Sequence, residues 1–305
     1  MLSHEGFVDL PQHKGEGGFD HAAVLTRTGR CYVAHTANDA IDVIDLVARK
    51  YVGSIPGLTA VAGAFVAESP DFVFTSNRGE DTVGIFSPTT ESHVQKVGVG
   101  VKPNGLAYDP GRQRLLSAHV GDEAVAGSHT VSIVDVAARK RIADIPVPGR
   151  TRWTVFDPPA GVFHVKVREP SCIVVVDSVH AKIQRVVDMP HAGAHGLDID
   201  VANRRLYCAC DAGVFVQVDA DTGAVMAEEK LAGVPDVVFF NPALARLYVA
   251  TGDPGVIEVF DTQPFRLRQT VTTGPGAHTL AFDAVRNLVC AFLPETHQAS
   301  VYADR

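Results

Sequence analysis

The chain has few cysteines, and their spacing builds no recognisable framework. The five cysteines are Cys31, Cys172, Cys208, Cys210 and Cys290. An odd number with no Cys-x-x-Cys pair indicates reduced thiols, as in a cytoplasmic protein. The alternation in "RLYCACD" predicts a strand that turns Cys208 and Cys210 to one face. We expect both to fill a core, since free cysteine is among the most buried residue types, and a soft metal pair is the alternative.

Long apolar runs and basic clusters are also missing. No run of about 18 apolar residues occurs, so we expect no membrane span. The first 20 residues show no basic segment followed by an apolar one, so no signal peptide is visible and we expect a cytoplasmic protein, or a periplasmic one if a leader has been removed. The formal charge is −8 with Lys and Arg scattered, which argues against nucleic acid or an anionic membrane as a partner.

Helical periodicity is absent, and a repeat of about 40 residues takes its place. Seven copies align on short opening stretches, among them "KPNGLAYD", "GAHGLDID" and "GAHTLAFD". The aligned positions are His21, Gly63, Asn104, Arg152, His195, Asp236 and His278. The third copy is longer because it carries the insert "VGDEAVAGSH", residues 120–129, which we interpret as a lid-like loop or a passive elaboration.

Each copy has the composition of four short strands. An apolar strand follows the opening stretch, a turn such as "DPGRQ" or "DVANR" comes next, and a second strand such as "RLYVAT" follows. A third strand such as "VIEVFDT" and a polar turn lead to a fourth. Four strands in about 40 residues are typical of a propeller blade, so we predict an all-β, seven-bladed β-propeller with four-stranded blades.

The two ends of the chain test this prediction. The last copy holds only three strands, whereas the N-terminal "EGFVDLPQ" has the pattern of a fourth. We therefore expect residues 4–12 to form the outer strand of the last blade, which closes the ring and removes a free sheet edge. The prediction is one domain over residues 1–305, with blades that begin near residues 20, 62, 103, 151, 194, 235 and 277.

The repeats resemble a known family. "KPNGLAYDPGRQRLLSAH" and "VPDVVFFNPALARLYVATGDPGVIEVFDT" are similar to YVTN-type β-propeller repeats, and the resemblance covers nearly the whole chain. The second and fourth copies depart from the pattern, with "VAGAFVAES" and "RTRWTVFD". The resemblance implies a propeller of the lactonase-like and cytochrome d1-like kind. It implies no single activity, because such propellers include lactonases, lyases, redox-linked proteins and binding scaffolds.

The opening positions are expected to ring one mouth of the central channel. Blades five, six, seven and one are neighbours once the ring closes, and they contribute His195, Asp236, His278 and His21. Three imidazoles and a carboxylate form a first shell for a divalent transition metal such as zinc, manganese, iron or nickel. Gly63 on the opposite arc leaves room in this arrangement.

The remaining ring positions suit an anionic substrate. Asn104 and Arg152, with Lys166 further out, are predicted to bind a small anion such as a carboxylate. His35 and His119, at the ends of second strands, are predicted to act as general acid or base. A metal in this site would act as a Lewis acid or activate water, so we expect a metal-assisted, lactonase-like hydrolase or a lyase.

Other interpretations stay open. Histidine at this repeat position also serves turn or cross-blade hydrogen bonds, and the protein is then a non-catalytic propeller that binds a protein or a ligand on one face. A third alternative is a metal-free site that transfers protons with His and Arg. The aspartates that follow first and third strands, such as Asp109, Asp200 and Asp283, are interpreted as turn formers.

Overall fold

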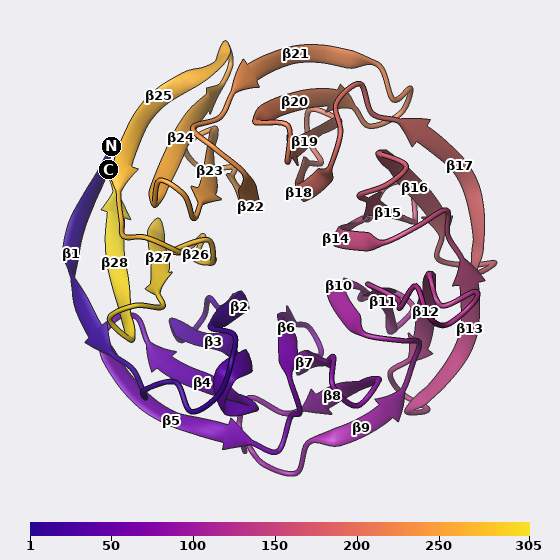
Figure 1. The fold of residues 1–305 in the computed structure, drawn as a ribbon, viewed down its shortest axis with the longest axis horizontal. Coiled ribbons are helices and arrows are strands. Elements are labelled where there is room, and N and C mark those ends of the chain that lie inside the picture. Colours follow the sequence, from indigo (N-terminus) through magenta and orange to yellow (C-terminus); the bar gives the residue numbers. More distant parts are fainter.

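Seven four-stranded antiparallel sheets stand in a ring around a central channel (Figure 1), and this confirms the predicted seven-bladed β-propeller. The computed structural model describes residues 1–305. Apart from one short 3-10 turn, η1 (Thr36–Asn38), every regular element is a strand. In each blade the first strand lies against the channel and the fourth lies at the rim.

The first three blades contain strands β2 to β13. Their bounds are β2 (Phe19–Leu25), β3 (Arg30–His35), β4 (Ala40–Asp45), β5 (Lys50–Pro56), β6 (Val61–Glu68), β7 (Asp71–Asn77), β8 (Thr82–Phe86), β9 (Gln95–Gly98), β10 (Pro103–Asp109), β11 (Arg114–His119), β12 (Thr130–Asp135) and β13 (Lys140–Pro146).

The other four blades contain strands β14 to β28 together with β1. Their bounds are β14 (Thr151–Asp157), β15 (Val162–Val167), β16 (Cys172–Asp177), β17 (Lys182–Asp188), β18 (Ala194–Asp200), β19 (Arg205–Cys210), β20 (Val214–Asp219), β21 (Val225–Lys230), β22 (Pro235–Asn241), β23 (Arg246–Thr251), β24 (Val256–Thr262), β25 (Phe265–Thr272), β26 (Leu280–Asp283), β27 (Leu288–Leu293), β28 (Gln298–Asp304) and β1 (Leu2–Asp9).

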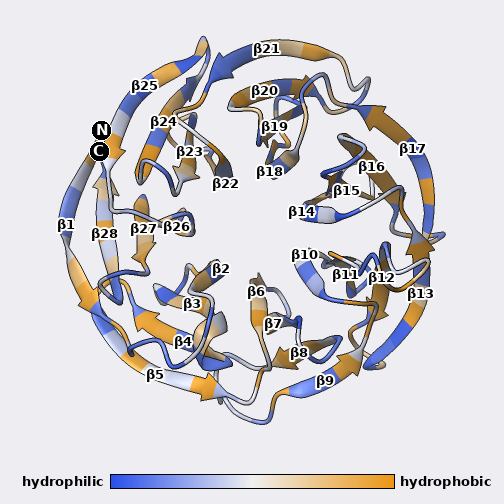
Figure 2. Cartoon of the chain, viewed as in Figure 1, coloured by the Kyte–Doolittle hydropathy of each residue, from blue (hydrophilic) through white to orange (hydrophobic).

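The core lies between the blades rather than in one centre. Seven apolar clusters fill the spaces between neighbouring blades, one cluster to each space. The second and third strands are buried on both faces, as in β15 and β16, and most of their residues are apolar. The outer strands alternate between exposed and half-buried residues, as in β17. Figure 2 shows hydrophilic and hydrophobic residues mixed along the strands of the rim. The blades are therefore held by face-to-face burial.

The N-terminal strand completes the last blade, as predicted. β1 pairs with β28 in antiparallel register, from Leu2 opposite Asp304 to Asp9 opposite Gln298. The expected span of residues 4–12 differs from the observed Leu2–Asp9. Residues 10–18 instead cross from the rim to the first strand of blade one, and Pro11 there has no N–H for a ladder.

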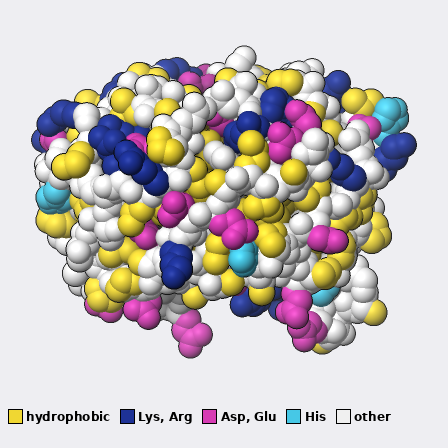
Figure 3. Space-filling view, turned by 90° about the horizontal axis from the view of Figure 1, so that it is seen from above, with side chains coloured by type: hydrophobic (Ala, Val, Ile, Leu, Met, Phe, Trp, Pro, Cys, Tyr) yellow, Lys and Arg dark blue, Asp and Glu magenta, His cyan; other side chains and the backbone are white.

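The turn aspartates have the structural role that the sequence indicates. Asp200 accepts a hydrogen bond from the backbone N–H of Asn203 at 3.0 Å, and Asp283 accepts two, at 3.1 Å each. All five cysteines are buried and free, which fits the predicted core-filling role. Charged side chains of both signs are interspersed over the edge of the disc that Figure 3 shows. The structure contains no helix of the length and hydropathy that a membrane crossing needs.

Candidate functional site

The strand pairing defines which residues share one level of the channel. In six blades the first residue of the first strand pairs with the last residue of the second strand. The pairing register between the two strands shifts directly after this pair. The next residue of each blade belongs to one ring at the mouth. That ring holds Asp20, Ala62, Asn104, Arg152, His195 and Asp236, and His278 follows the same spacing in the last blade.

Two predicted ring members therefore lie one level lower. His21 and Gly63 are the third residues of their strands, and Asp20 and Ala62 occupy the ring positions assigned to them from the sequence. The irregular pairing at the start of each first strand hides this offset in a sequence alignment. The mouth thus carries one more carboxylate and one fewer imidazole than expected.

An imidazole held between two carboxylates dominates one arc of the mouth. His195 Nδ1 lies 2.8 Å from Asp211 Oδ1, and Nε2 lies 2.9 Å from Asp236 Oδ1. Burial lowers the pKa of His195, but the two carboxylates outweigh it and the pKa is raised. Burial alone would raise the pKa of Asp236, yet the neighbouring histidines bring it well below the ordinary range. Because each ring nitrogen faces a carboxylate oxygen, this arrangement favours His195 as an imidazolium that donates to both carboxylates.

His278 extends this arc toward the last blade. Its Nε2 lies 3.7 Å from the second oxygen of Asp236, and its Nδ1 lies 2.7 Å from the carbonyl oxygen of Gly276. The side chain of His278 is 40% exposed, which is the most open position among the three histidines predicted here. It is a candidate for direct contact with a ligand from solvent.

An arginine links the ring on the opposite arc. Arg78 contacts the Asn104 side-chain oxygen and lies 3.2 Å from an Asp20 carboxylate oxygen. Asn104 is nearly fully buried, and its side chain is occupied by this contact. Asn104, which was predicted to bind substrate, therefore positions an arginine at the channel mouth.

Arg152 is the one charged ring residue without a partner. Its neighbours at the mouth, Arg78 and Arg168, both form ion pairs with aspartates. The Nε atom of Arg152 is buried and has no hydrogen-bond partner, and the side chain forms no ion pair. Burial and the nearby Arg150 guanidinium lower the pKa of Arg152. A half-buried cation with a buried donor that lacks a partner is unfavourable in the free protein and is a ready partner for an anion.

The mouth residues do not surround a common point. Both ring nitrogens of His195 contact carboxylates, Nδ1 of His278 contacts a carbonyl, and His21 lies a level below. No three His, Cys, Asp or Glu side chains of the structure are arranged as a metal-holding group. The predicted ligand set, His21, His195, Asp236 and His278, is here an ion-pair network, and metal binding by it stays a prediction.

An aromatic layer closes the channel beneath the mouth. Trp153, from blade four, packs its ring 4.2 Å from that of His21 in blade one, so the two side chains meet across the channel. Burial lowers the pKa of His21, so its imidazole is neutral at pH 7. Gly63 belongs to this layer, and a Cβ there would come within 2.6 Å of the Asn104 carbonyl oxygen. That glycine permits close packing of two blades rather than leaving room for a substrate.

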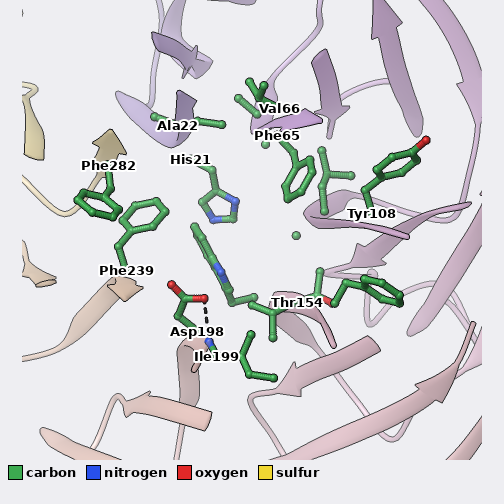
Figure 4. Close-up of a pocket in the computed structure, with 18 of the residues that line it drawn as sticks. His21, Ala22, Phe65, Val66, Tyr108, Thr154, Asp198, Ile199, Phe239 and Phe282 are labelled. Atoms are coloured by element: carbon green, nitrogen blue, oxygen red, sulfur yellow. Dashed lines mark hydrogen bonds between the residues drawn. The ribbon is translucent and has the colours of Figure 1, made fainter. Parts of the chain in front are cut away.

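An apolar cavity of about 470 Å³ lies along the channel below Trp153. Figure 4 shows its wall of aromatic and aliphatic side chains, which includes Phe65, Phe239 and Phe282. One carboxyl group, Asp198, interrupts this wall. It accepts hydrogen bonds from the backbone N–H groups of Ile199 at 2.8 Å and Phe240 at 2.7 Å. Burial raises its pKa to about 7, so the group exchanges a proton near neutrality.

The predicted acid–base histidines lie inside the blades. His35 is fully buried, with Nδ1 2.6 Å from Asp42. His119 is also fully buried, with Nδ1 2.8 Å from Thr130 Oγ1, and burial lowers its pKa to about 3. The structure therefore does not bring either to the mouth. The residues at the ends of second strands turn inward because successive side chains of a strand alternate faces.

Lys166 is likewise enclosed. Its side chain is fully buried between blades four and five, and Nζ lies 2.8 Å from Cys208 Sγ. It does not join Arg152 at the mouth, so the structure separates these two predicted substrate-binding residues. Around the second strands, the residues that reach the mouth are those that directly follow the buried last residue of the strand.

Three residues that the sequence pattern did not assign to the site complete it. Arg78, Arg168 and Asp211 each follow a second strand by one residue, and Arg168 contacts Asp211 at 2.8 Å. Arg168 and Asp211 line a depression of about 570 Å³ on the mouth face, between blades four and five. The one-residue alternation of a strand could have identified them, since the residue beyond a buried end points the other way.

Comparisons with known proteins bear on the fold. No model of a protein family matches the chain, and neither does any curated protein. Among solved structures, a chain of Kuenenia stuttgartiensis hydrazine synthase is similar, with a TM-score of 0.84, 12% identity, and coverage of 96% of this chain and 97% of that one. A chain of a mitotic checkpoint complex has a TM-score of 0.83 and 10% identity, with coverage of 99% and 92%. These likenesses show that the chain is a seven-bladed β-propeller.

Proposed function

We propose that the protein binds a small anionic molecule at the channel mouth, with the Arg152 guanidinium as the group that receives the anion. The observation that carries this proposal is the buried, unpartnered Nε of Arg152, because other charged side chains at the mouth, such as Arg78 and His195, pair with aspartates. Charge-assisted hydrogen bonds from a planar guanidinium are strong and suit carboxylates and phosphates.

The surroundings of Arg152 favour an anion of limited size. Arg150 is adjacent, and burial and the Arg168 guanidinium lower the pKa of Arg150, so three guanidinium groups share one part of the mouth. The depression beside Arg168 on the mouth face supplies space next to these guanidinium groups. Trp153 and His21 close the channel below, so the molecule rests on an aromatic surface.

Hydrolase or lyase chemistry would use the imidazolium of His195. Its raised pKa and its position next to Asp236 make it a proton donor once a ligand displaces one carboxylate contact. A metal-assisted, lactonase-like reaction requires the same displacement, since both His195 nitrogens are occupied. A chelator that abolishes turnover supports the metal-assisted reaction. Turnover that survives a chelator and is lost in His195→Gln supports the metal-free one.

The chain offers a direct probe of binding, because Trp153 is its single tryptophan. Titration with mono- and dicarboxylates and with inorganic phosphate, followed by tryptophan fluorescence and calorimetry, tests the proposal. Loss of a charged hydrogen bond costs about 1.5–3 kcal/mol, so we expect Arg152→Gln to weaken binding roughly 10- to 150-fold.

The matched control is Arg266→Gln, which changes an arginine on the outer strand β25 whose side chain is 64% exposed. It should leave affinity unchanged. Arg152→Lys keeps the charge but not the planar donors, and we expect an intermediate loss. Equal affinity for wild type and Arg152→Gln would overturn the proposal. So would the absence of any anion that binds, in which case the propeller is better described as a scaffold.

A further inference from the structure

A second group of histidines lies at the seam where the ring closes. The segment of residues 10–18 leaves β1 at the rim and runs inward to β2, as the indigo end of the ribbon shows in Figure 1. His13 on this segment packs between His35 of blade one and His297 of blade seven. The ring centroids of His13 and His35 are 4.9 Å apart, and those of His13 and His297 are 4.4 Å apart.

Each of these three imidazoles has one buried nitrogen without a hydrogen-bond partner. The atoms are Nε2 of His13, Nε2 of His35 and Nδ1 of His297. An unsatisfied buried polar atom normally costs 1–3 kcal/mol, so three of them at one place are unusual in a native protein. Aromatic packing alone does not account for nitrogens that all lack partners.

The surroundings of His35 resemble those of histidines that bind metal ions. His35 is fully buried, and its Nδ1 lies 2.6 Å from Asp42, a contact that favours the tautomer with its lone pair on the unpartnered Nε2. Ser54 in turn donates a hydrogen bond to the other oxygen of Asp42. A carboxylate that fixes the tautomer and orientation of a histidine is the usual outer partner of a metal-binding imidazole.

The separations of His13 from His35 and from His297 are also compatible with a shared ion. Two imidazoles that bind zinc tetrahedrally at about 2.0–2.1 Å have ring centroids roughly 5 Å apart. Two hydrogen bonds hold the segment in place: Lys14 N–H donates to the side-chain Oδ1 of Asn38 at 2.9 Å, and Leu10 N–H donates to the His297 carbonyl at 2.8 Å. The three rings do not yet surround one point in this conformation, so binding requires rotation of the half-buried His13 and His297.

We propose that His13, His35 and His297 bind a divalent transition metal of the zinc type, with Asp42 as the positioning residue of His35. The ion joins the N-terminal crossing segment to the first and last blades and stabilises the closed ring. A fourth position remains for water, because His13 and His297 lie at the surface end of the seam. The site is separate from the channel mouth and does not depend on its proposed function.

The test uses the full chain without a histidine tag, after treatment with a chelator, and the probes are Zn²⁺ and Co²⁺. At 100 times the dissociation constant, we expect Zn²⁺ to raise the melting temperature by about 4 °C. We expect Co²⁺ to give visible bands of tetrahedral intensity. Both effects should disappear in His13→Gln and in His297→Gln, while Asp42→Asn should weaken binding roughly 10- to 100-fold.

Two controls separate this site from others. His4→Gln changes an exposed histidine of β1, and His195→Gln changes the channel mouth; both should keep the full response. No response of the wild type to either ion would overturn the proposal, and so would a response that survives in both seam variants. Loss in His195→Gln alone would place the ion at the mouth instead. Nitrogen shifts of the three histidines in NMR spectra of the wild type with Zn²⁺ provide a readout that needs no variant.

Discussion

The ion pair between His195 and Asp236 gives a quantitative prediction at the mouth. In Asp236→Asn, His195 keeps Asp211 at 2.8 Å, and the amide oxygen of Asn still accepts a hydrogen bond. A charged hydrogen bond contributes about 1.5–3 kcal/mol, whereas breaking a fully buried pair costs about 3–5 kcal/mol. Because one carboxylate remains, we expect a loss of about 1.5–2 kcal/mol in the free energy of unfolding, at the lower end of that range.

The sign of the pH dependence follows from the two pKa shifts. The pKa of His195 is raised in the folded state, so its contribution is fully present below 6.5 and is lost as pH rises through the folded value. The pKa of Asp236 is lowered, so its contribution is present above 3.8 and is lost as pH falls through the folded value. The pair therefore stabilises the folded state most between pH 3.8 and pH 6.5.

A double-mutant cycle measures this coupling. Urea unfolding of the wild type, Asp236→Asn, His195→Gln and the double variant at pH 5.5 should give a coupling of about 1–2 kcal/mol. The coupling should be smaller at pH 9 than at pH 5.5, because the imidazolium loses its proton as pH rises through the raised pKa of His195. Asp71→Asn, which removes an exposed partner of Arg27, serves as the control and should show no such change with pH. A coupling below about 0.5 kcal/mol at pH 5.5, or one that is equal at both pH values, would refute the assignment of His195 as an imidazolium.

Two further predictions concern groups inside the ring. The carboxyl carbon of Asp198 should titrate near pH 7 in NMR spectra, because burial raises its pKa to about 7, and the signal should vanish in Asp198→Asn; a midpoint below pH 5 would contradict burial as the cause. Lys166→Met should raise the free energy of unfolding by about 1 kcal/mol or more, because an apolar side chain of similar length replaces a buried cation that has no carboxylate partner. Chemical denaturation measures this change. A loss of stability would contradict the prediction and show that the contact with Cys208 is favourable.

The blades could be predicted from the sequence because their signals are local. Apolar alternation, turn aspartates and the spacing of the copies each repeat seven times, and the three-strand last copy required the N-terminal strand. The placement of Asp20 rather than His21 in the mouth ring could not be read in this way. It depends on an irregular pairing within each first strand, which shifts the register without changing the length of the repeat.

The candidate site was predicted in part for a similar reason. Arg152, His195 and Asp236 follow from blade order alone, and the structure brings His195 and Asp236 into contact. His35 and Lys166 were placed on the correct strands, but the face to which a side chain points changes with every residue. His13 and His297 of the seam were not predicted, because they lie in connections outside the aligned stretches, where repeats give no register.

The position of a bound anion tests the central claim most directly. Crystals of the protein soaked in bromide can be measured at the bromine absorption edge, so that anomalous scattering locates each ion without reference to a chosen ligand. We predict a peak within hydrogen-bond distance of the Arg152 guanidinium, above the ring of Trp153, and its loss in Arg152→Gln. Peaks elsewhere on the surface with none at Arg152 would contradict the assignment of the channel mouth as an anion-binding site.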